Sequence, residues 1–197
     1  MTPIRTFVAI HLTPALIAAL QQTQDALRAT SGGLAGRWVP ADNMHLTLKF
    51  LGDVESARLA EVHAAVDGVA GECGPLTLTL QGMGCFPSAR RPRVVWAGIH
   101  EPTGRLLRLA EALDAALGRL GYAREQRAYR AHLTLARIRE GAPGWQVEAL
   151  GQAVESHQPP EVSMVAHELA VVRSDLRPQG PLYSDLHTAP LSGPNAG

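Results

Sequence analysis

The chain has little of several residue types and motifs on which common protein activities depend. Its two cysteines, Cys73 and Cys85, form neither a CxxC pair nor a disulfide framework, which excludes a zinc finger and a thioredoxin-like redox site. The sequence has no GxxxxGK[ST], GxGxxG or GxSxG segment, so the usual signatures of nucleotide binding and serine hydrolysis are absent. No apolar run reaches the roughly 18 residues of a membrane span. We therefore expect a globular protein without a metal or cofactor.

The N-terminal segment is apolar but does not match a signal peptide. His11, Thr13 and Pro14 interrupt the run, and QQTQD follows where a small-residue cleavage site would be needed. We interpret this segment as a strand followed by a helix, and we expect a cytoplasmic monomer.

The formal net charge of zero hides an uneven distribution. Residues 86–139 hold 11 arginines and 4 acidic residues, a formal net charge of +7. The rest of the chain holds 7 basic and 14 acidic residues, a formal net charge of −7. Lys49 is the single lysine among 18 basic residues. Solvated arginine-rich faces are one explanation of this pattern. A local positive field that attracts a phosphate-bearing ligand is the other, since arginine suits bidentate phosphate contact.

Hydrophobic periodicity predicts that short strands and helices alternate along the chain. We expect strands at Phe7–Ile10, His45–Leu51, Leu76–Gln81, Val94–Ile99 and His132–Ile138 and near 162–174 and 182–186, helices at about 14–28, 56–70, 103–117 and 144–156, and a loop from Gly82 to Pro92. Similar features recur 87 to 89 residues apart, which indicates an internal duplication. We therefore predict a single domain over residues 1–197 of α+β class. It would have two pseudo-symmetric lobes of largely antiparallel sheet, with helices outside and a central cleft.

The tetrapeptide His-Leu-Thr-Leu occurs twice, at residues 45–48 and 132–135. Because side chains alternate along a strand, each His and its Thr share one face and the two Leu share the other. A single His-x-Thr strand is usually an ordinary strand with a polar face, and His11-Leu12-Thr13 is interpreted in that way. Two identical tetrapeptides at matched positions of a duplicated unit instead predict two imidazoles and two hydroxyls across one cleft.

Two facing histidines suit in-line displacement at phosphorus. An imidazole titrates near pH 6.5, so one ring can accept a proton from the nucleophile while the other donates one to the leaving oxygen. Threonine hydroxyls can hold the non-bridging oxygens, and nearby arginines can stabilise the developing charge. This chemistry requires no metal.

The sequence resembles the RNA 2′,3′-cyclic phosphodiesterase branch, also called 2′-5′ RNA ligase, of the two-histidine phosphoesterase superfamily. The resemblance spans nearly the whole chain and rests on the two motifs and on segments 5–10, 38–52, 86–87, 92–98, 132–137, 174–176 and 180–183. It implies a bilobal α+β fold and metal-independent hydrolysis of a terminal 2′,3′-cyclic phosphate, leaving a 2′-phosphate. Family analogy favours His132 as the base and His45 as the acid.

By motif position, the resemblance implies that His45, Thr47, His132 and Thr134 are the catalytic residues and that Arg137 contacts phosphate. Strict alternation would turn Arg137 away from His132 unless a bulge intervenes. Lys49 has the parity of His45 and Thr47, so it is either a further phosphate contact or a solvated lysine.

Two aromatic residues, Trp38 and Tyr129, lie shortly before the motifs and are candidates for stacking on a base, as in proteins that bind single-stranded RNA. Core packing is the alternative for Trp38, and we assign Phe86 and Trp96 to the core.

Three further functions stay open at this point. The reverse reaction would join a 5′-hydroxyl RNA end to the cyclic phosphate through a 2′-5′ bond. The same site could act on a small cyclic nucleotide. A module that binds RNA ends without turnover would use the histidines only as phosphate contacts.

Overall fold

The computed structural model of the protein describes residues 3–178 and 180–194. Its helices and strands follow one another in this order: β1 (Ile4–His11), α1 (Pro14–Arg28), β2 (Gly36–Trp38), β3 (His45–Val54), α2 (Leu59–Gly71), β4 (Leu76–Phe86), β5 (Val94–His100), α3 (Arg105–Arg119), β6 (His132–Ile138), α4 (Gly144–Ser156), β7 (Ser163–Ala166), β8 (Glu168–Arg177) and β9 (Gly180–Pro190). Short 3-10 turns η1 (Gly33–Ala35), η2 (Ala41–Asn43) and η3 (Ser56–Arg58) precede β2, β3 and α2.

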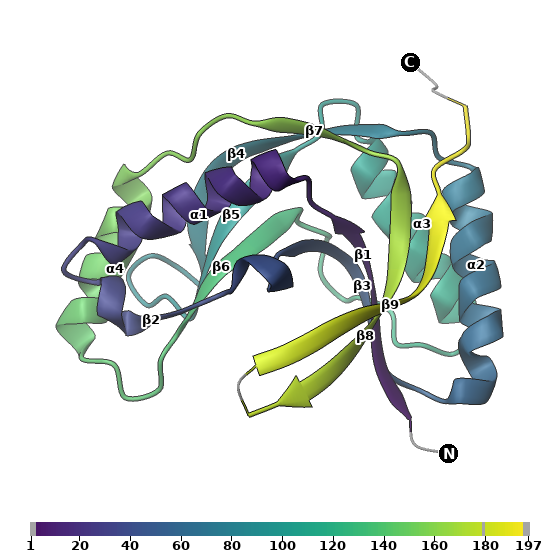
Figure 1. Cartoon of the computed structure of the whole chain (residues 1–197), viewed down its shortest axis with the longest axis horizontal. Coiled ribbons are helices and arrows are strands. Elements are labelled where there is room, and N and C mark those ends of the chain that lie inside the picture. Colours follow the sequence, from purple (N-terminus) through teal and green to yellow (C-terminus); the bar gives the residue numbers. More distant parts are fainter. Residues whose placement is uncertain (1–2, 179, 195–197) are drawn as a thin grey trace.

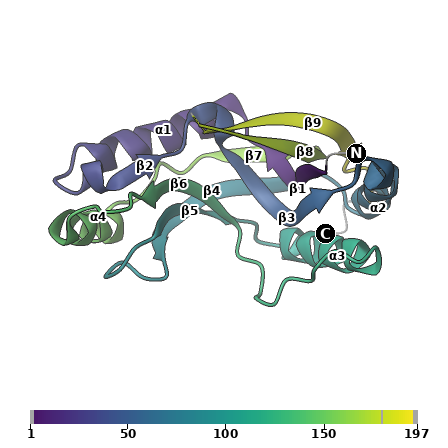
Figure 2. The same cartoon turned by 90° about the horizontal axis from the view of Figure 1, so that it is seen from below.

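The strands form two antiparallel sheets, one in each lobe. The first has the order β3-β1-β8-β9 and the second the order β2-β6-β5-β4-β7. Helices α2 and α3 pack together against the first sheet, and α1 and α4 lie at the second (Figures 1 and 2). The predicted α+β class with two antiparallel sheets and outer helices is confirmed.

The core lies between each sheet and its helices. In the motif strands, Leu46, Leu48, Leu133 and Leu135 are all at most 4% exposed, so the leucine face of each motif packs inward. The histidine and threonine of each motif lie on the other face. We call this other face of each sheet its motif face.

The lobes are interwoven along the chain. After β1 in the first sheet, the chain passes to α1 and β2 beside the second sheet and then returns to the first with β3. After β5 in the second sheet, α3 packs against β3 of the first. Each lobe thus carries one motif strand, but neither corresponds to one continuous half of the sequence.

Several features differ from the expected elements. The strand expected near 162–174 is divided into β7 and β8, which belong to different sheets. Strand β2 has only three residues and shows no periodicity of its own. Strand β4 continues to Phe86, where we expected a loop, because an irregularity between Leu80 and Met83 lets its pairing with β5 resume. Gly82 takes a φ of +75° within this irregularity, a conformation that glycine adopts readily. None of the helices in the described ranges is both long and apolar enough to cross a membrane.

Candidate active site

Both motif strands contain a bulge directly after the motif threonine. In β3, Thr47 pairs with Ala9 and Lys49 with Val8, so Leu48 is an extra residue. In β6, Thr134 pairs with Trp96 and Ala136 with Val95, so Leu135 is the extra residue. A bulge reverses the alternation of the residues that follow it. The two strands accordingly share the same burial sequence from histidine to the sixth residue, ending in exposed Phe50 and exposed Arg137.

His45 is held in an aromatic setting on the first motif face. Its ring stacks on Phe7 at 4.6 Å between centroids and meets the edge of Tyr183 at 5.1 Å. Burial lowers the pKa of His45 to about 4; a hydrogen bond to the Asn43 backbone opposes this shift and the neighbouring His11 adds to it. The ring is therefore neutral at pH 7 in the unliganded protein.

His132 occupies the matching position on the second motif face. Its Nδ1 lies 2.7 Å from the carbonyl oxygen of Arg130. A carbonyl can only accept, so Nδ1 carries a proton and the neutral ring presents Nε2 as its basic atom. The ring also meets the edge of Phe86 at 5.2 Å, and Phe86 stacks on Trp96. Both motif histidines are thus fixed by the backbone two residues before them and by an aromatic neighbour.

Tyr183 lies on the first motif face and is under the electrostatic influence of an arginine of the second sheet. This residue of β9 contacts His45, and burial raises the pKa of its hydroxyl, whereas the nearby guanidinium groups of Arg137 and Arg5 oppose that shift. Arg137 belongs to the second sheet, so side chains of both lobes share this space. The hydroxyls of Thr47 and Thr134 have no hydrogen-bond partner among residues 3–178 and 180–194, and both side chains are half-buried. They are free to bind a ligand.

Strict alternation along β6 would turn Arg137 away from His132, and the bulge at Leu135 prevents this. The bulge returns Arg137 to the face of His132 and Thr134, where its side chain is exposed. The carbonyl of Leu135 accepts hydrogen bonds from Val39 N and from Nε2 of the buried Gln24 side chain, each at 2.9 Å. Helix α1 therefore stabilises the bulge that turns Arg137 to the motif face.

Lys49 fits neither expectation, a phosphate contact or a solvated lysine, for the same physical reason. The bulge at Leu48 turns Lys49 to the helix side, where it is 1% exposed. Its Nζ donates to Asp114 of α3 at 2.7 Å and to the carbonyl of Ala123. Burial alone would raise the pKa of Asp114, but hydrogen bonds from Lys49, Glu125 N and Arg124 outweigh it and hold that pKa at about 2.

The two predicted stacking residues also have structural roles. Trp38 pairs with buried Ala136, its Nε1 donates to the Gly33 carbonyl at 3.1 Å, and Arg28 lies over its ring, so it faces α1. Tyr129 donates its hydroxyl proton to the Thr47 carbonyl at 3.0 Å, and burial raises its pKa. Both side chains are nevertheless half-buried, so their stacking on a base stays a prediction.

Sequence reasoning missed several residues of the first motif face. His11 lies directly opposite His45, and its Nε2 is 2.9 Å from Asp185 of β9. Phe7, two positions from Ala9 on the same strand face, supports the His45 ring. The alternation of Phe7, Ala9 and His11 in β1 could have indicated this face. Tyr183 lies in a segment that carries the family resemblance, but the local pattern places neither Tyr183 nor Asp185 on this face, because their position depends on how β9 pairs with β8.

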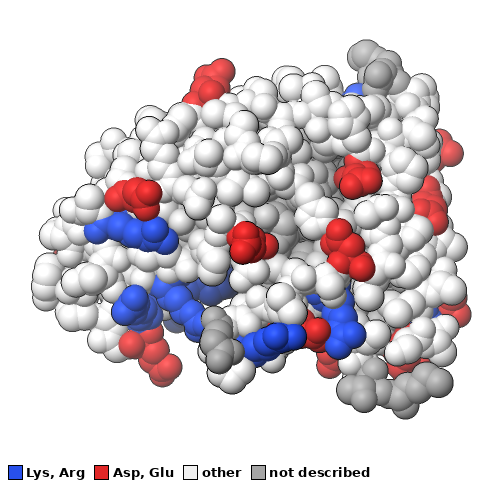
Figure 3. All heavy atoms as spheres, in the orientation of Figure 1, with Lys and Arg blue, Asp and Glu red and all other residues white. Residues whose placement is uncertain are grey.

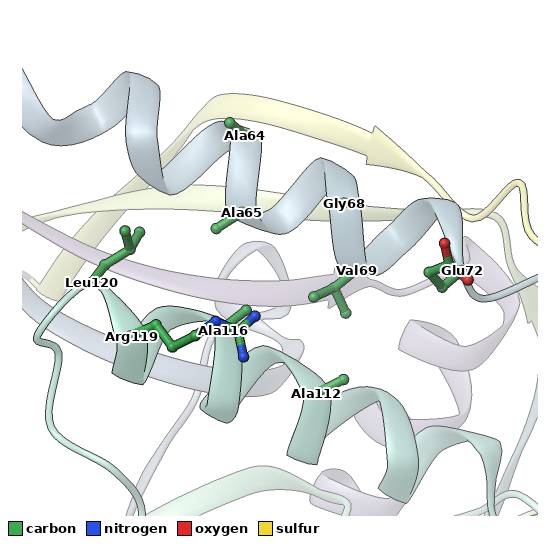
Figure 4. Close-up of a pocket in the computed structure, with 9 residues that line it drawn as sticks. All are labelled: Ala64, Ala65, Gly68, Val69, Glu72, Ala112, Ala116, Arg119 and Leu120. Carbon is green, nitrogen blue, oxygen red and sulfur yellow. The ribbon is translucent and has the colours of Figure 1, made fainter.

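Other candidate sites lie outside the motif faces. The rings of His63 and His187 stack at 4.5 Å, and His187 contacts Asp67 at 2.6 Å. An open groove of about 450 Å³ lies between α2 and α3, lined mostly by small side chains such as Ala65 and Ala116 (Figure 4). In the described part of the chain, no three His, Cys, Asp or Glu side chains form a group that could hold a metal ion.

Comparisons with known proteins place this geometry in context. The family model described as LigT-like phosphoesterase matches residues 10–96 and 98–183. RNA 2′,3′-cyclic phosphodiesterase of Methanothermobacter thermautotrophicus is 32% identical over 184 residues, which cover 93% of this chain and 96% of the relative. The relative of the same name from Thermus thermophilus is 32% identical over 200 residues, which cover 96% of this chain and 91% of the relative.

Solved structures agree with the sequence relatives. A structure from Thermus thermophilus superposes with a TM-score of 0.78 at 31% identity and covers 96% of this chain and 98% of its own. E. coli LigT complexed with 3′-AMP gives a TM-score of 0.74 at 29% identity, with 96% and 99% of the two chains covered.

Proposed function

This chain belongs to the LigT-like phosphoesterase family, and we propose that it hydrolyses the 2′,3′-cyclic phosphate at an RNA end by two-histidine acid–base catalysis, leaving a 2′-phosphate. The observation that carries this proposal is that the two histidines are held in the same way. Each lies on a motif face, is hydrogen-bonded to the backbone two residues earlier and is supported by an aromatic ring. The comparisons supply the reaction: the relatives reported above are named RNA 2′,3′-cyclic phosphodiesterases.

In the proposed reaction, Nε2 of His132 takes a proton from water as the water oxygen forms a bond to phosphorus. The bond between phosphorus and the 3′ oxygen breaks, and His45 donates its Nε2 proton to that oxygen. The products are a 2′-phosphomonoester and a 3′-hydroxyl. Thr47 and Thr134 donate to the non-bridging oxygens and stabilise the negative charge that develops there.

Because its pKa is low, His45 has no proton to donate at neutral pH until the substrate binds. Burial destabilises the imidazolium in the unliganded protein, and an anionic phosphate beside the ring would stabilise it. His45 would therefore take up its proton as the substrate binds. The protonated ring can then donate its proton to the alkoxide-like leaving oxygen.

The test is incubation with an RNA that ends in a 2′,3′-cyclic phosphate, followed by identification of the hydroxyl that keeps the phosphate. We expect the 2′-phosphate. His45→Ala and His132→Ala should each lower turnover by about 10²–10⁴-fold while RNA binding persists. His167→Ala, at an exposed position outside both motif faces, is the matched control. Undiminished turnover in either motif variant contradicts the acid–base assignment.

The same experiment separates the alternatives. Added RNA with a 5′-hydroxyl end would give a 2′-5′ joined product if the reverse reaction prevails. Faster turnover of a cyclic mononucleotide than of a cyclic-ended RNA would identify a small substrate. Binding without turnover in the unmodified protein would leave only an RNA-end binding module.

A further inference from the structure

Two arginines face each other across the edge of the second sheet. Arg37 of the edge strand β2 pairs directly with Arg137 of β6, and both side chains are exposed. Residues directly opposite in an antiparallel pair have Cβ atoms about 4.5–5.5 Å apart, and like charges in that position repel each other. This pair therefore opposes sheet formation.

Both arginines belong to the motif face of the second sheet. The next pair along the two strands is Trp38 with Ala136, and these residues face the helix side: Ala136 is fully buried and Trp38 bonds to Gly33. Side chains alternate along a strand, so Arg37 points to the opposite side, with Arg137. Thr134, Arg137 and Arg37 therefore lie on one face of the sheet, with Thr134 and Arg137 on β6 and Arg37 on the edge strand β2.

Neither arginine is neutralised by a carboxylate. Several other arginines form ion pairs: Arg28 with Asp25, Arg58 with Glu61, Arg124 with Asp114 and Arg173 with Asp175. Arg37 and Arg137 form none with any carboxylate of the described chain. Basic side chains gather around the hollow beside the β8–β9 hairpin (Figure 3). A repulsive, unpaired and exposed arginine pair beside a phosphate-handling site has the properties of an anion site.

We propose that Arg37, together with Arg137, binds the phosphodiester immediately 5′ to the terminal nucleoside of the RNA. The proposal rests on the proposed function, because it defines where the strand leaves the reaction site. Arg137 lies roughly 7 Å beyond Thr134, counted as two strand rises after the bulge, which is on the order of one nucleotide's reach. Arg37 lies further out at the edge. The substrate is accordingly an RNA end of at least two nucleotides rather than a lone cyclic nucleotide.

The test uses three substrates that differ at one group. They are a nucleoside 2′,3′-cyclic phosphate, a dinucleotide that ends in the cyclic phosphate, and the same dinucleotide with an uncharged methylphosphonate linkage. Arg37→Gln should lower kcat/KM for the charged dinucleotide by about five- to twentyfold, as expected for one arginine–phosphate contact. It should change kcat/KM for the other two by less than about twofold. Arg108→Gln, at an exposed position on α3, is the matched control and should affect none of them.

The salt dependence provides a second readout. For the charged dinucleotide, kcat/KM should fall less steeply with rising salt in Arg37→Gln, because one screened arginine–phosphate contact is lost. Equal losses on all three substrates, or no loss on any, would overturn the proposal.

If the unmodified protein hydrolyses none of the three, the proposed function fails, and the subsite is then decided by binding alone. In that case the affinity for a dinucleotide that ends in a 2′-phosphate is compared with that for its methylphosphonate analogue. Tighter binding of the charged form, lost in Arg37→Gln, supports the subsite, whereas equal affinities refute it.

Discussion

The hydroxyl of Tyr129 donates a 3.0 Å hydrogen bond to the backbone carbonyl of Thr47, which joins the segment that leads into one motif strand to the bulged centre of the other. This bond links the supports of the two histidines across the lobes. Because burial of its hydroxyl raises the pKa of Tyr129, the hydroxyl keeps its proton and stays a donor near neutral pH.

Tyr129→Phe is expected to remove this link without leaving a cavity. We expect a loss of about 1 kcal/mol in the free energy of unfolding and a several-fold lower kcat with little change in KM, because the histidines are held less firmly relative to each other. Denaturant unfolding and steady-state kinetics measure the two effects. Tyr122→Phe is the matched control, since the buried Tyr122 hydroxyl has no hydrogen-bond partner in the described part of the chain and its loss should cost little. A kcat equal to that of the unmodified protein would show that the link does not set the site's geometry.

Lys49→Met is expected to reduce stability while leaving substrate affinity intact. The substitution removes the buried cation that bonds Asp114, while Arg124 and Glu125 N still bond that carboxylate, so the loss should be about 1.5–3 kcal/mol. Because Lys49 lies on the helix side of β3, KM of the folded protein should change less than about twofold.

The double variant Lys49→Met/Asp114→Leu should recover part of the lost stability, because replacing both partners leaves no buried unpaired charge. Denaturant unfolding of the single and double variants gives the comparison. A variant with normal stability and a strongly raised KM would restore the interpretation that Lys49 holds phosphate.

The low pKa of His45 predicts a characteristic pH dependence of stability. The unfolded imidazole takes up a proton near pH 6.5, whereas the folded one does so near pH 4. Between these values the unfolded state binds more protons at this position, so the free energy of unfolding falls as the pH drops through this window. His45→Gln should lack this contribution. The difference between the two unfolding profiles from pH 7 to 4 tests it.

Ligand binding should reverse the shift of His45. With a nucleotide 2′-phosphate bound, the anionic phosphate stabilises the imidazolium, so the pKa of His45 should rise by one unit or more. Nuclear magnetic resonance titration of the His45 ring protons, with and without ligand, measures this directly. A titration midpoint that the ligand leaves unchanged would remove His45 from contact with the phosphate.

Gly84→Ala is expected to disturb the support of His132. A Cβ at this position would lie 2.3 Å from Cζ2 of Trp96, and Trp96 stacks on Phe86, which meets the His132 ring. We expect a loss of about 1–3 kcal/mol in stability together with reduced kcat. Gly68→Ala, where a Cβ meets nothing within 4 Å on helix α2, should instead raise stability by up to about 1 kcal/mol. Similar effects of the two substitutions would contradict the packing argument.

Much of this fold follows from periodicity. The repeated tetrapeptide predicted two strands with leucine inside and histidine outside, and the structure has both. Helices α1 and α4 begin and end at the expected residues. These features depend on local alternation, which a single sequence displays.

The residues after the motifs could not be placed in the same way. A bulge exists only relative to a partner strand, so counting by two assigned Lys49 to the site and left Arg137 in doubt. The face of Trp38 depends on its pairing with Ala136, and the position of Tyr183 on the pairing of β9 with β8. Hydrogen bonds between strands that are distant in sequence determine these positions, and the alternation of residues within one strand does not reveal them.

The crossing of α1 and α3 between the lobes has a consequence for how this protein can be divided or assembled. A cut anywhere between the two motif strands would deprive at least one sheet of its covering helix or of a neighbouring strand, so the fragments should not fold as independent halves. The contacts that complete each lobe join residues distant in sequence, a pattern that slows folding. Catalytic activity should therefore appear late in folding and in a single step. A nascent or nicked chain should be inactive until the β8–β9 hairpin has formed.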